Sequence, residues 1–393
     1  MADIKERAKV LNDQIVQWRR HLHQNPEIGL DTPKTEAFIV ERLREMGIDE
    51  IRTGVGGHGV AALLRGSRPG KVLGMRADMD ALPVKEETGL PFASTTEGRM
   101  HACGHDAHVA ILLGTAKLLA ENRGDLAGAV KLIFQPSEED SRGALAMIRD
   151  GVLEDPPLDA LIGLHTGNLW KGPRSGMVGY RYGALMAAAD WFTVTFEGKG
   201  GHGATPHLAV DPIAMACQAF SAIQTIVSRE TNPLAPAVIT VGRIDGGSAP
   251  NIIGPCCTLK GTIRSLDPET RSLLGERIKT VCEGIARGMR GRAEVTLTRG
   301  APALVNDRKI TDGVIEAAAA IVGEDAVAEI AEPTMGGEDM AFFLEKVPGS
   351  FFFLPSMPGE GEVYPHHHPK FDLDEGVFWI GSAVMANFAL TWQ

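Results

Sequence analysis

Side chains that can carry out chemistry gather in three short stretches of the sequence. Residues 76–83 (RADMDALP) directly follow the apolar run 71–75, and residues 135–140 (QPSEED) directly follow the apolar run 129–134. Residues 100–108 (MHACGHDAH) open a helical pattern. Open α/β sheets bind their ligands at the carboxyl ends of the strands. We therefore expect the three stretches to meet at one edge of a sheet.

The stretch 100–108 combines a thiol with an imidazole, because Cys103 and His105 are two residues apart. This donor pair suits a borderline-soft cation, and Zn²⁺ is its usual occupant. The alternative is a helix start that carries histidines and a buried thiol without binding a metal. Further donors are expected at the same edge of the sheet, and they favour the metal site. They are Glu138, Glu139 and His165.

Two adjacent carboxylates, Glu138 and Glu139, follow Pro136 in a predicted loop. Successive residues point in different directions, so one carboxylate can face an ion while its neighbour faces the attacking water. A carboxylate base beside metal-activated water is typical of metallohydrolases. The alternative is a solvated acidic turn, which Asp140 would extend.

A second histidine cluster lies in residues 364–371 (YPHHHPKF). Three adjacent histidines cannot all reach one ion, so at most one or two of His366, His367 and His368 are ligands. A polar loop without a metal is the alternative.

Alternating helices and strands are expected to position these stretches. Helical spacing runs from the start of the chain to Pro26, and a second helix is expected from about Thr35 to Gly47. Strands and helices then alternate, which favours a mostly parallel sheet covered by helices. The predicted strands are 60–64, 71–75, 129–134 and 159–164, and the predicted helices among them are 108–120 and 144–149.

The pattern changes over residues 188–299. Residues 191–197 alternate between polar and apolar side chains, which indicates a half-exposed strand. This segment is typical of an antiparallel α+β module with one polar and one apolar sheet face. Its other predicted elements are helices at 211–228 and 269–287 and strands at 237–244, 258–265 and 293–298. The α/β pattern returns after Gly300, so we predict a discontinuous domain, 1–187 and 300–393, with 188–299 inserted in it.

Composition excludes several classes of protein. Hydrophobic residues make up 44% and charged residues 23%, which is ordinary for a globular protein. The 46 glycines have no regular period, which excludes collagen and indicates many tight turns. A net charge of −11 argues against nucleic-acid and anionic-membrane partners. The chain lacks a signal-peptide pattern and has five scattered cysteines, so we expect a cytoplasmic protein without a disulfide framework.

The motifs together resemble the aminoacylase/carboxypeptidase family of co-catalytic metal amidohydrolases. Within it, the chain is most similar to the branch of bacterial hippurate hydrolases, N-acyl-amino-acid deacetylases and plant auxin-conjugate hydrolases. The resemblance covers nearly the whole chain. A match to one motif alone would be weak evidence for the family, whereas seven motifs in the same order are specific to it. They are 19–27 (RRHLHQNPE), 76–83, 100–108, 135–139, 200–207 (GGHGATPH), 261–264 (GTIR) and 337–339 (GED).

The resemblance implies a phosphorylase/hydrolase-like catalytic domain that binds two divalent ions, Zn²⁺ first, with Mn²⁺, Co²⁺ or Ni²⁺ as alternatives. Cys103 stands where many relatives outside this branch have a bridging aspartate. Glu138 matches the general base, and Asp78 matches a carboxylate that orients the ligands. In the histidine triplet, the family pattern His-x-Pro-x-Phe selects His367. The implied ligands are Cys103, His105, Glu139, His165 and His367.

The inserted domain is implied to be a lid that forms a homodimer or homotetramer. His202 matches a histidine that reaches the substrate carbonyl, in dimeric relatives from the partner chain. Asn251 and Arg264 have the family spacing of a substrate-contacting Asn and a carboxylate-binding Arg, whose guanidinium fork fits a carboxylate. The family's Asn-x-Ile-Pro turn has Gly254 in place of proline, which puts the reach of Asn251 in question.

The reaction implied by the resemblance is hydrolysis of the amide bond of an N-acyl or N-aroyl L-amino acid. A metal-bound hydroxide would attack, with Glu138 as general base, and the products would be a carboxylate and a free amino acid. Two alternatives stay open: a dipeptidase or metallocarboxypeptidase acting on short peptides, and a non-catalytic binding scaffold. The sequence leaves the acyl group and the physiological metal open.

Overall fold

The computed structural model describes residues 2–170, 172–359 and 362–392. The chain forms two compact units. The first consists of Met1–Leu185, Val305–Pro333 and Asp339–Gln393, and the second of Met186–Leu304 and Thr334–Glu338. The predicted insertion over 188–299 falls within the second unit, which extends beyond it at both ends. The second unit also includes the separate short segment Thr334–Glu338.

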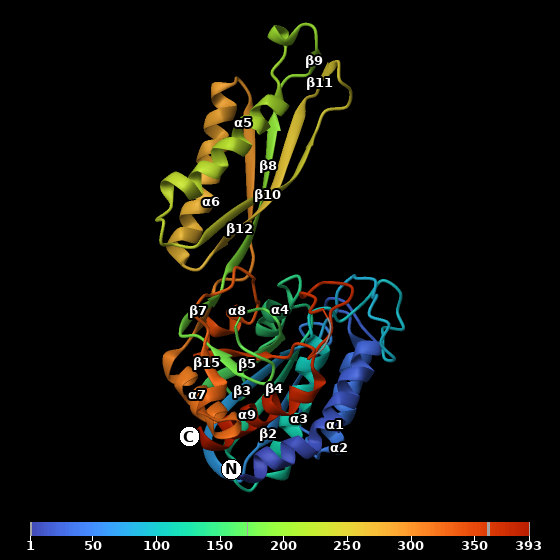
Figure 1. Cartoon of the computed structure of the whole chain (residues 1–393). Helices are drawn as coiled ribbons and strands as arrows, with labels where there is room; N and C mark the ends of the chain where they lie inside the picture. Colours follow the sequence, from blue (N-terminus) through green and yellow to red (C-terminus); the bar gives the residue numbers. More distant parts are fainter. Residues whose placement is uncertain (1, 171, 360–361, 393) are drawn as a thin grey trace. The chain divides into compact units, whose positions relative to one another are not determined.

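A central sheet crosses the first unit (Figure 1). Within the described residues it has eight strands, in the order β1-β2-β4-β3-β5-β16-β6-β15. Its four middle strands are parallel to one another, whereas β1, β2 and β6 introduce antiparallel pairs. The strands are β1 (Ile51–Val55), β2 (Gly59–Arg65), β3 (Arg68–Asp78), β4 (Ala127–Gln135), β5 (Ala160–Gly167), β6 (Val178–Tyr180), β15 (Val327–Glu329) and β16 (Gly349–Pro355).

The middle strands of this sheet are buried on both faces because helices cover it. Every residue of β5 and β16 is buried, as expected for near-continuous apolar strands of a parallel sheet. Helix α3 is also buried on nearly all sides and packs against α1, α9 and β3. The helices of this unit are α1 (Ala2–Gln24), α2 (Pro33–Glu45), α3 (His105–Glu121), α4 (Gly143–Arg149), α7 (Arg308–Val322), α8 (Ala341–Leu344) and α9 (Phe378–Thr391).

The second unit contains an antiparallel sheet in the order β10-β12-β8-β13, with α5 and α6 side by side on one of its faces (Figure 1). The alternation in β8 is the predicted one, since Phe192, Val194 and Phe196 are buried while Trp191 is 40% exposed. A separate ribbon pairs β9 with β11. The elements are β8 (Ala188–Glu197), β9 (Gly201–His202), α5 (Pro212–Thr225), β10 (Ala237–Gly246), β11 (Ile252–Ile253), β12 (Cys256–Ser265), α6 (Pro268–Gly288) and β13 (Arg292–Arg299).

The predicted fold class, an α/β domain with a mostly parallel sheet plus an antiparallel α+β module, is confirmed. None of the helices in the described residues combines the length and the apolar character of a membrane-spanning segment. The remaining short elements are strands β7 (Gly183–Met186) and β14 (Leu304–Asn306), which pair with each other, the 3₁₀ turns Pro206–Leu208, Glu324–Ala326 and Glu375–Val377, and one π turn, Ile226–Glu230.

Candidate metal centre

Adjacent parallel strands bring the predicted stretches together at one edge of the central sheet. Asp78, the last residue of β3, pairs with Gln135, the last residue of β4, and the Met79 amide continues this register by donating to the Gln135 carbonyl at 2.8 Å. On the other side of β3, Arg76 pairs with Gly163 of β5. The carboxyl ends of three strands therefore lie side by side, as expected from the sequence.

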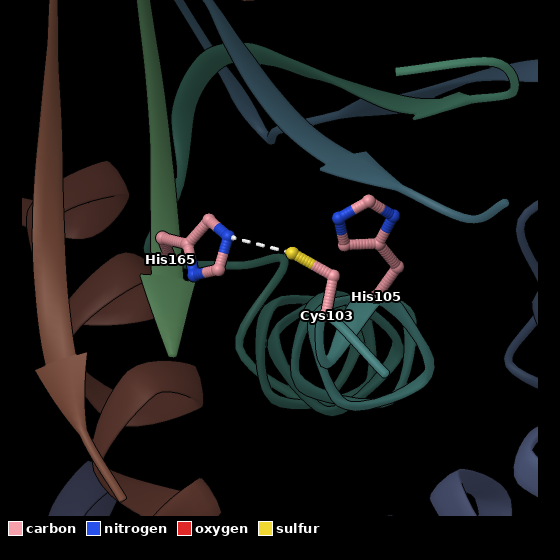
Figure 2. Close-up of side chains that lie close together, drawn as sticks. All are labelled: Cys103, His105 and His165. Atoms are coloured by element: carbon pink, nitrogen blue, oxygen red, sulfur yellow. Dashed lines mark hydrogen bonds between the residues drawn. The ribbon is translucent and has the colours of Figure 1, made fainter. Parts of the chain in front are cut away.

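Cys103, His105 and His165 converge on one point at this edge (Figure 2). The Cys103 Sγ lies 3.6 Å from the His165 Nε2. Figure 2 shows Cys103 and His105 at the beginning of α3 and His165 on β5, with all three side chains directed into the same space. Gly104, between the first two, has a φ of +88°, a left-handed conformation that glycine adopts most readily. This turn lets both neighbours face the site.

Glu138, Glu139 and His367 complete the cluster. The Glu139 Oε2 lies 3.4 Å from the His367 Nε2, and the Glu139 Oε1 lies 3.9 Å from the His105 Nε2. Ligand atoms of Cys103, Glu139 and His367 form one compact group, and those of His105, Glu138 and Glu139 form another. Since Cys103 also groups with His105 and His165, its thiol belongs to two neighbouring donor sets.

The histidine triplet separates in the structure. His367 has a left-handed backbone, with φ of +67°, and its amide donates to the Ala102 carbonyl at 2.8 Å, which holds it beside Glu139. The half-buried His366 instead has its Nε2 3.1 Å from the Thr166 carbonyl oxygen. His368 stacks on Tyr364 with ring centroids 4.6 Å apart, as aromatic pairs commonly do. Within the described residues, His367 is thus the member of the triplet that shares a donor group with Cys103.

Two buried atoms of this cluster test whether it suits a cation. The His105 Nε2 and the Glu139 Oε1 have no hydrogen-bond partner in the described residues, although they face each other at 3.9 Å. Such orphaned polar atoms are costly in a protein interior. A divalent ion between imidazole, thiolate and carboxylate donors would satisfy both, so the donor set fits a metal.

The electrostatics of the cluster point to the same conclusion. Burial opposes a charged His105, yet Asp78, Asp80 and Glu139 raise its pKa to about 10. Burial, followed by the nearby Glu139, Glu138 and Asp78 carboxylates, raises the pKa of the Cys103 thiol well above its usual value. The carboxylates that contribute to both shifts make this interior negative, so a cation would be stabilised there and would replace the thiol proton.

The second ring nitrogens of two histidines are held by backbone carbonyls. The His105 Nδ1 lies 2.9 Å from the Asp80 carbonyl oxygen, and the His165 Nδ1 lies 2.7 Å from the Thr166 carbonyl oxygen. A donated Nδ1–H fixes the tautomer and leaves Nε2 free to accept a metal. Burial and the neighbouring His108 and His366 rings also hold the pKa of His165 well below its ordinary value, which favours the neutral, ligating form.

Behind the cluster lies a buried network that sequence reasoning did not assign. The predicted orienting residue, Asp78, accepts from the Arg76 Nη1 at 2.7 Å and lies 2.5 Å from the His108 Nδ1. Arg76 also donates to Gln135 and to Asp339 at 2.9 and 3.0 Å. The spacing of Arg76 and Asp78 at the end of one strand was the available signal, because residues two apart on a strand share a face.

The other three predicted site residues belong to the second unit. His202 lies in β9, and Asn251 directly precedes the paired strand β11; the Gly203 amide donates to the Asn251 carbonyl at 2.9 Å. The Ala204 amide donates to the His202 Nδ1 at 3.0 Å. Arg264 lies on β12, where it pairs with Val238 of β10. Its side chain is half-buried and makes no hydrogen bond or ion pair with any residue that the structure describes.

A parallel α/β sheet with thiol, imidazole and carboxylate donors at its strand ends defines a metal-dependent hydrolase of the two-domain type. The model of a family described as peptidase family M20/M25/M40 matches residues 74–391. The chain belongs to this family. The resemblance inferred from the seven motifs is thereby confirmed.

Relatives and a solved structure agree with this membership. The chain is 44% identical to an N-acetyl-L-cysteine deacetylase of Bacillus subtilis over 93% of its length and 85% of the relative's. It is 38% identical to a hippurate hydrolase of Campylobacter jejuni, over 89% of each chain. It also resembles the crystal structure of the Bacillus subtilis YxeP protein, titled a dinuclear metal binding peptidase from the M20 family. That match has a TM-score of 0.84 and 35% identity, and covers 97% of this chain and 98% of the other. The prediction of an amidohydrolase is confirmed by these relatives.

Proposed function

We propose that this protein is a binuclear metal-dependent enzyme that hydrolyses N-acyl or N-aroyl L-amino acids to a carboxylate and a free amino acid. The observation that carries the proposal is the convergence of Cys103, His105, Glu139, His165 and His367 beside Glu138 at one edge of the sheet. The names of the deacetylase and hippurate hydrolase relatives support the choice of substrate class.

Two donor sets are available for two ions, and they share Cys103. One set adds His105 and His165, and the other adds Glu139 and His367. Thiolate and imidazole ligands favour Zn²⁺, with Mn²⁺, Co²⁺ and Ni²⁺ as further candidates. When bound, such ions lower the pKa of water toward neutrality and polarise an amide carbonyl.

Glu138 is proposed as the general base. Its carboxylate is largely buried, its Oε2 lies 4.0 Å from the His105 Nε2, and its Oε1 lies 3.4 Å from the Asp339 amide. Glu138 takes a proton from the attacking water and gives it to the leaving amine. Because Glu139 points its Oε2 at His367, the two adjacent carboxylates divide the roles of base and ligand.

The second unit is proposed to recognise the substrate. A half-buried guanidinium without a protein carboxylate partner, as at Arg264, suits the α-carboxylate of an amino acid. In a neutral His202, the Ala204 amide occupies Nδ1, so the ring proton lies on Nε2. That N–H is a donor suited to the oxyanion of the reacting amide. Asn251 is proposed to assist Arg264.

We also propose a homodimer or homotetramer formed through the second unit, in which the partner chain supplies His202, and a location in the cytoplasm. The five cysteines are all free, which suits a reducing compartment.

The proposal is tested with metal-free enzyme reloaded separately with Zn²⁺, Mn²⁺, Co²⁺ and Ni²⁺. We expect release of amino acid from N-acetyl, N-benzoyl or indolyl-acyl amino acids, and loss of release after chelation. The Glu138→Gln variant should bind metal but lose about 10²–10⁴-fold in kcat, the usual contribution of a general base. Faster cleavage of dipeptides would favour the peptidase alternative. If no amino acid is released from any acyl amino acid or dipeptide, the non-catalytic binding scaffold is the alternative that remains.

A further inference from the structure

One carboxylate outside the donor sets touches both adjacent glutamates of the site. The Asp80 Oδ1 accepts the Glu138 amide at 2.9 Å, and the Asp80 Oδ2 accepts the Glu139 amide at 3.2 Å. Asp80 is 2% exposed. Each of its oxygens therefore binds the backbone of one glutamate, and in the described residues Asp80 belongs to none of the candidate metal groups.

The loop after β4 is shaped to present these two amides. Ser137 adopts a φ of +60°, which is uncommon for a residue other than glycine. Two successive amides then point toward one carboxylate, as in backbone concavities that bind anions. The Ser137 hydroxyl donates to Asp140 at 2.6 Å, which closes the turn on its other side.

Asp80 also contacts a third site residue through its main chain. Its carbonyl oxygen lies 2.9 Å from the His105 Nδ1. The segment that carries Asp80 is itself fixed, because the flanking Met79 and Ala81 amides donate to the carbonyls of Gln135 and Glu27 at 2.8 and 2.7 Å. A residue anchored on both sides thus holds a base, a carboxylate donor and an imidazole donor in one arrangement.

We propose that Asp80 is a positioning residue that sets the relative orientation of Glu138, Glu139 and His105 for metal binding and proton transfer. This inference rests on the proposed function for the roles of the three residues. Asp80 acts through the backbone of the two glutamates and through His105, whose Nδ1 also lies 3.5 Å from the Asp80 Oδ1.

An aspartate is required because both partners are donors. Asparagine is isosteric, but its amide nitrogen would face one of the two backbone N–H groups, so one amide would lose its acceptor. The loop could then turn Glu138 or Glu139 away from the site without any change of charge on the glutamates themselves.

The chain offers a matched control at the opposite end of β3. The Asp159 Oδ2 accepts the Val72 amide at 2.7 Å. This bond has the same chemistry, a carboxylate on a backbone amide, but lies near the beginning of β3, away from the strand ends that form the site. Because Asn keeps one oxygen acceptor, Asp159→Asn can retain this single bond. The variant therefore controls for replacement of a carboxylate by an amide without disturbing the metal ligands.

The experiment compares Asp80→Asn with Asp159→Asn and the unmodified enzyme. Loss of a partner behind a metal ligand typically costs 10–100-fold in affinity or activity. We expect Asp80→Asn to lower kcat by about 10–100-fold with KM changed by less than about threefold, and to weaken binding of Zn²⁺ to the metal-free protein by a similar factor, measured by calorimetric titration. Asp159→Asn should leave both quantities unchanged.

Equal kcat and equal Zn²⁺ affinity in Asp80→Asn and the unmodified enzyme would overturn the proposal, and so would equal losses in the two variants. If the Asp80 variant does not fold, hydrogen exchange of the unmodified protein decides. Protected Glu138 and Glu139 amides support the proposal, whereas exchange at the rate of an open loop contradicts it. If the unmodified enzyme hydrolyses no amide, the proposed function fails, and the Zn²⁺ titration still judges Asp80.

Discussion

The Nδ1 of His23 lies 2.7 Å from the Oδ2 of Asp106, and both side chains are fully buried. The Arg19 Nε donates to the same oxygen at 2.8 Å, and its Nη1 reaches Glu375 at 3.1 Å. Asp106 immediately follows His105 in the sequence. This buried ionic network therefore ties α1 both to the beginning of α3 and to the chain that follows the histidine triplet.

The network predicts a large loss of stability for Asp106→Asn. Removing one partner of a buried ion pair leaves an uncompensated charge and costs about 3–5 kcal/mol. We expect a fall of this size in the free energy of unfolding of the first unit, measured by urea denaturation of the metal-free protein. Glu121→Gln is the control, because the exposed Arg7–Glu121 pair should contribute only about 0–1 kcal/mol. Similar losses in the two variants would contradict a buried network.

The same network predicts a dependence of stability on pH. Burial and Arg19 oppose a charged His23, but hydrogen bonds to Asp106 and Glu86 raise its pKa above the ordinary value. The ring of His101, whose centroid lies 6.3 Å from that of His23, has its pKa lowered by burial and so favours the uncharged form. A raised pKa stabilises the fold below the unfolded value of about 6.5, and this contribution is lost as the pH rises through the folded pKa.

His23→Gln should therefore reduce the free energy of unfolding most below about pH 6.5, with a difference from the unmodified protein that shrinks as the pH rises. Urea denaturation at a series of pH values measures it. A difference that grows with pH would show that His23 is held neutral.

Replacement of Cys103 by serine is predicted to impair metal binding. Serine keeps the size of the side chain but lacks a thiolate, which soft and borderline metals prefer. We expect a loss of Zn²⁺ affinity greater than the ~10–100-fold typical of an outer partner, measured by calorimetric titration of metal-free protein. Cys217→Ser, at an exposed free cysteine, should bind Zn²⁺ normally. Unchanged Zn²⁺ affinity and stoichiometry in Cys103→Ser would show that the thiol is not a metal ligand.

Arg264→Lys is predicted to raise KM. Lysine keeps the charge but loses the planar fork that grips a carboxylate with two bonds. One charge-assisted bond contributes about 1.5–3 kcal/mol, so KM for an N-acyl amino acid should rise about tenfold or more while kcat changes less. The variant should also discriminate less between the substrate and its α-amide. Arg243→Lys is the control, since Arg243 is already paired with Asp245. A KM unchanged in Arg264→Lys would place carboxylate recognition elsewhere.

Gly104→Ala is predicted to disturb the centre more than the fold. At a φ of +88°, alanine costs about 1–2 kcal/mol of backbone strain, and its Cβ would lie 3.2 Å from the Thr166 methyl and 3.3 Å from Leu373. Gly47→Ala is the control, with a φ of +72° and no atom within 4 Å of the added Cβ. Both variants should lose stability in urea, but only Gly104→Ala should lose Zn²⁺ affinity. Equal Zn²⁺ affinity in the two would exclude a role for this turn in aligning Cys103 and His105.

Local pattern was sufficient for much of the fold and of the site. The apolar runs before Asp78 and Gln135 predicted that their polar successors meet at one sheet edge, and period-two alternation predicted the buried face of β8 around Val194. The three-residue strands β6 and β15 carry too few residues to show a period, so sequence pattern alone does not predict them.

Tertiary contacts explain what sequence reasoning missed in the site. The Asp80 carboxylate accepts from backbone amides of the loop after β4, and the Asp339 carboxylate accepts from the Ala144 amide at the beginning of α4. No spacing in the sequence reveals which amide a carboxylate will meet. Similarly, the pairing of Arg76 with Asp339 joins residues from distant parts of the chain. Residue type marked these positions as polar, but only the folded chain shows what they hold.

The order of the chain has a consequence for how the enzyme is made. Strand β16 inserts beside β5, and α9 packs on α1 and α3, so the last stretch of the sequence completes the core begun by the first. His367 belongs to that last stretch, whereas Cys103, His105, Glu139 and His165 all precede the second unit. During synthesis, which proceeds from the N-terminus, four donors emerge well before the fifth. The centre therefore matures only after translation has passed His367, and long-range pairing of this kind makes its assembly a slow, late event.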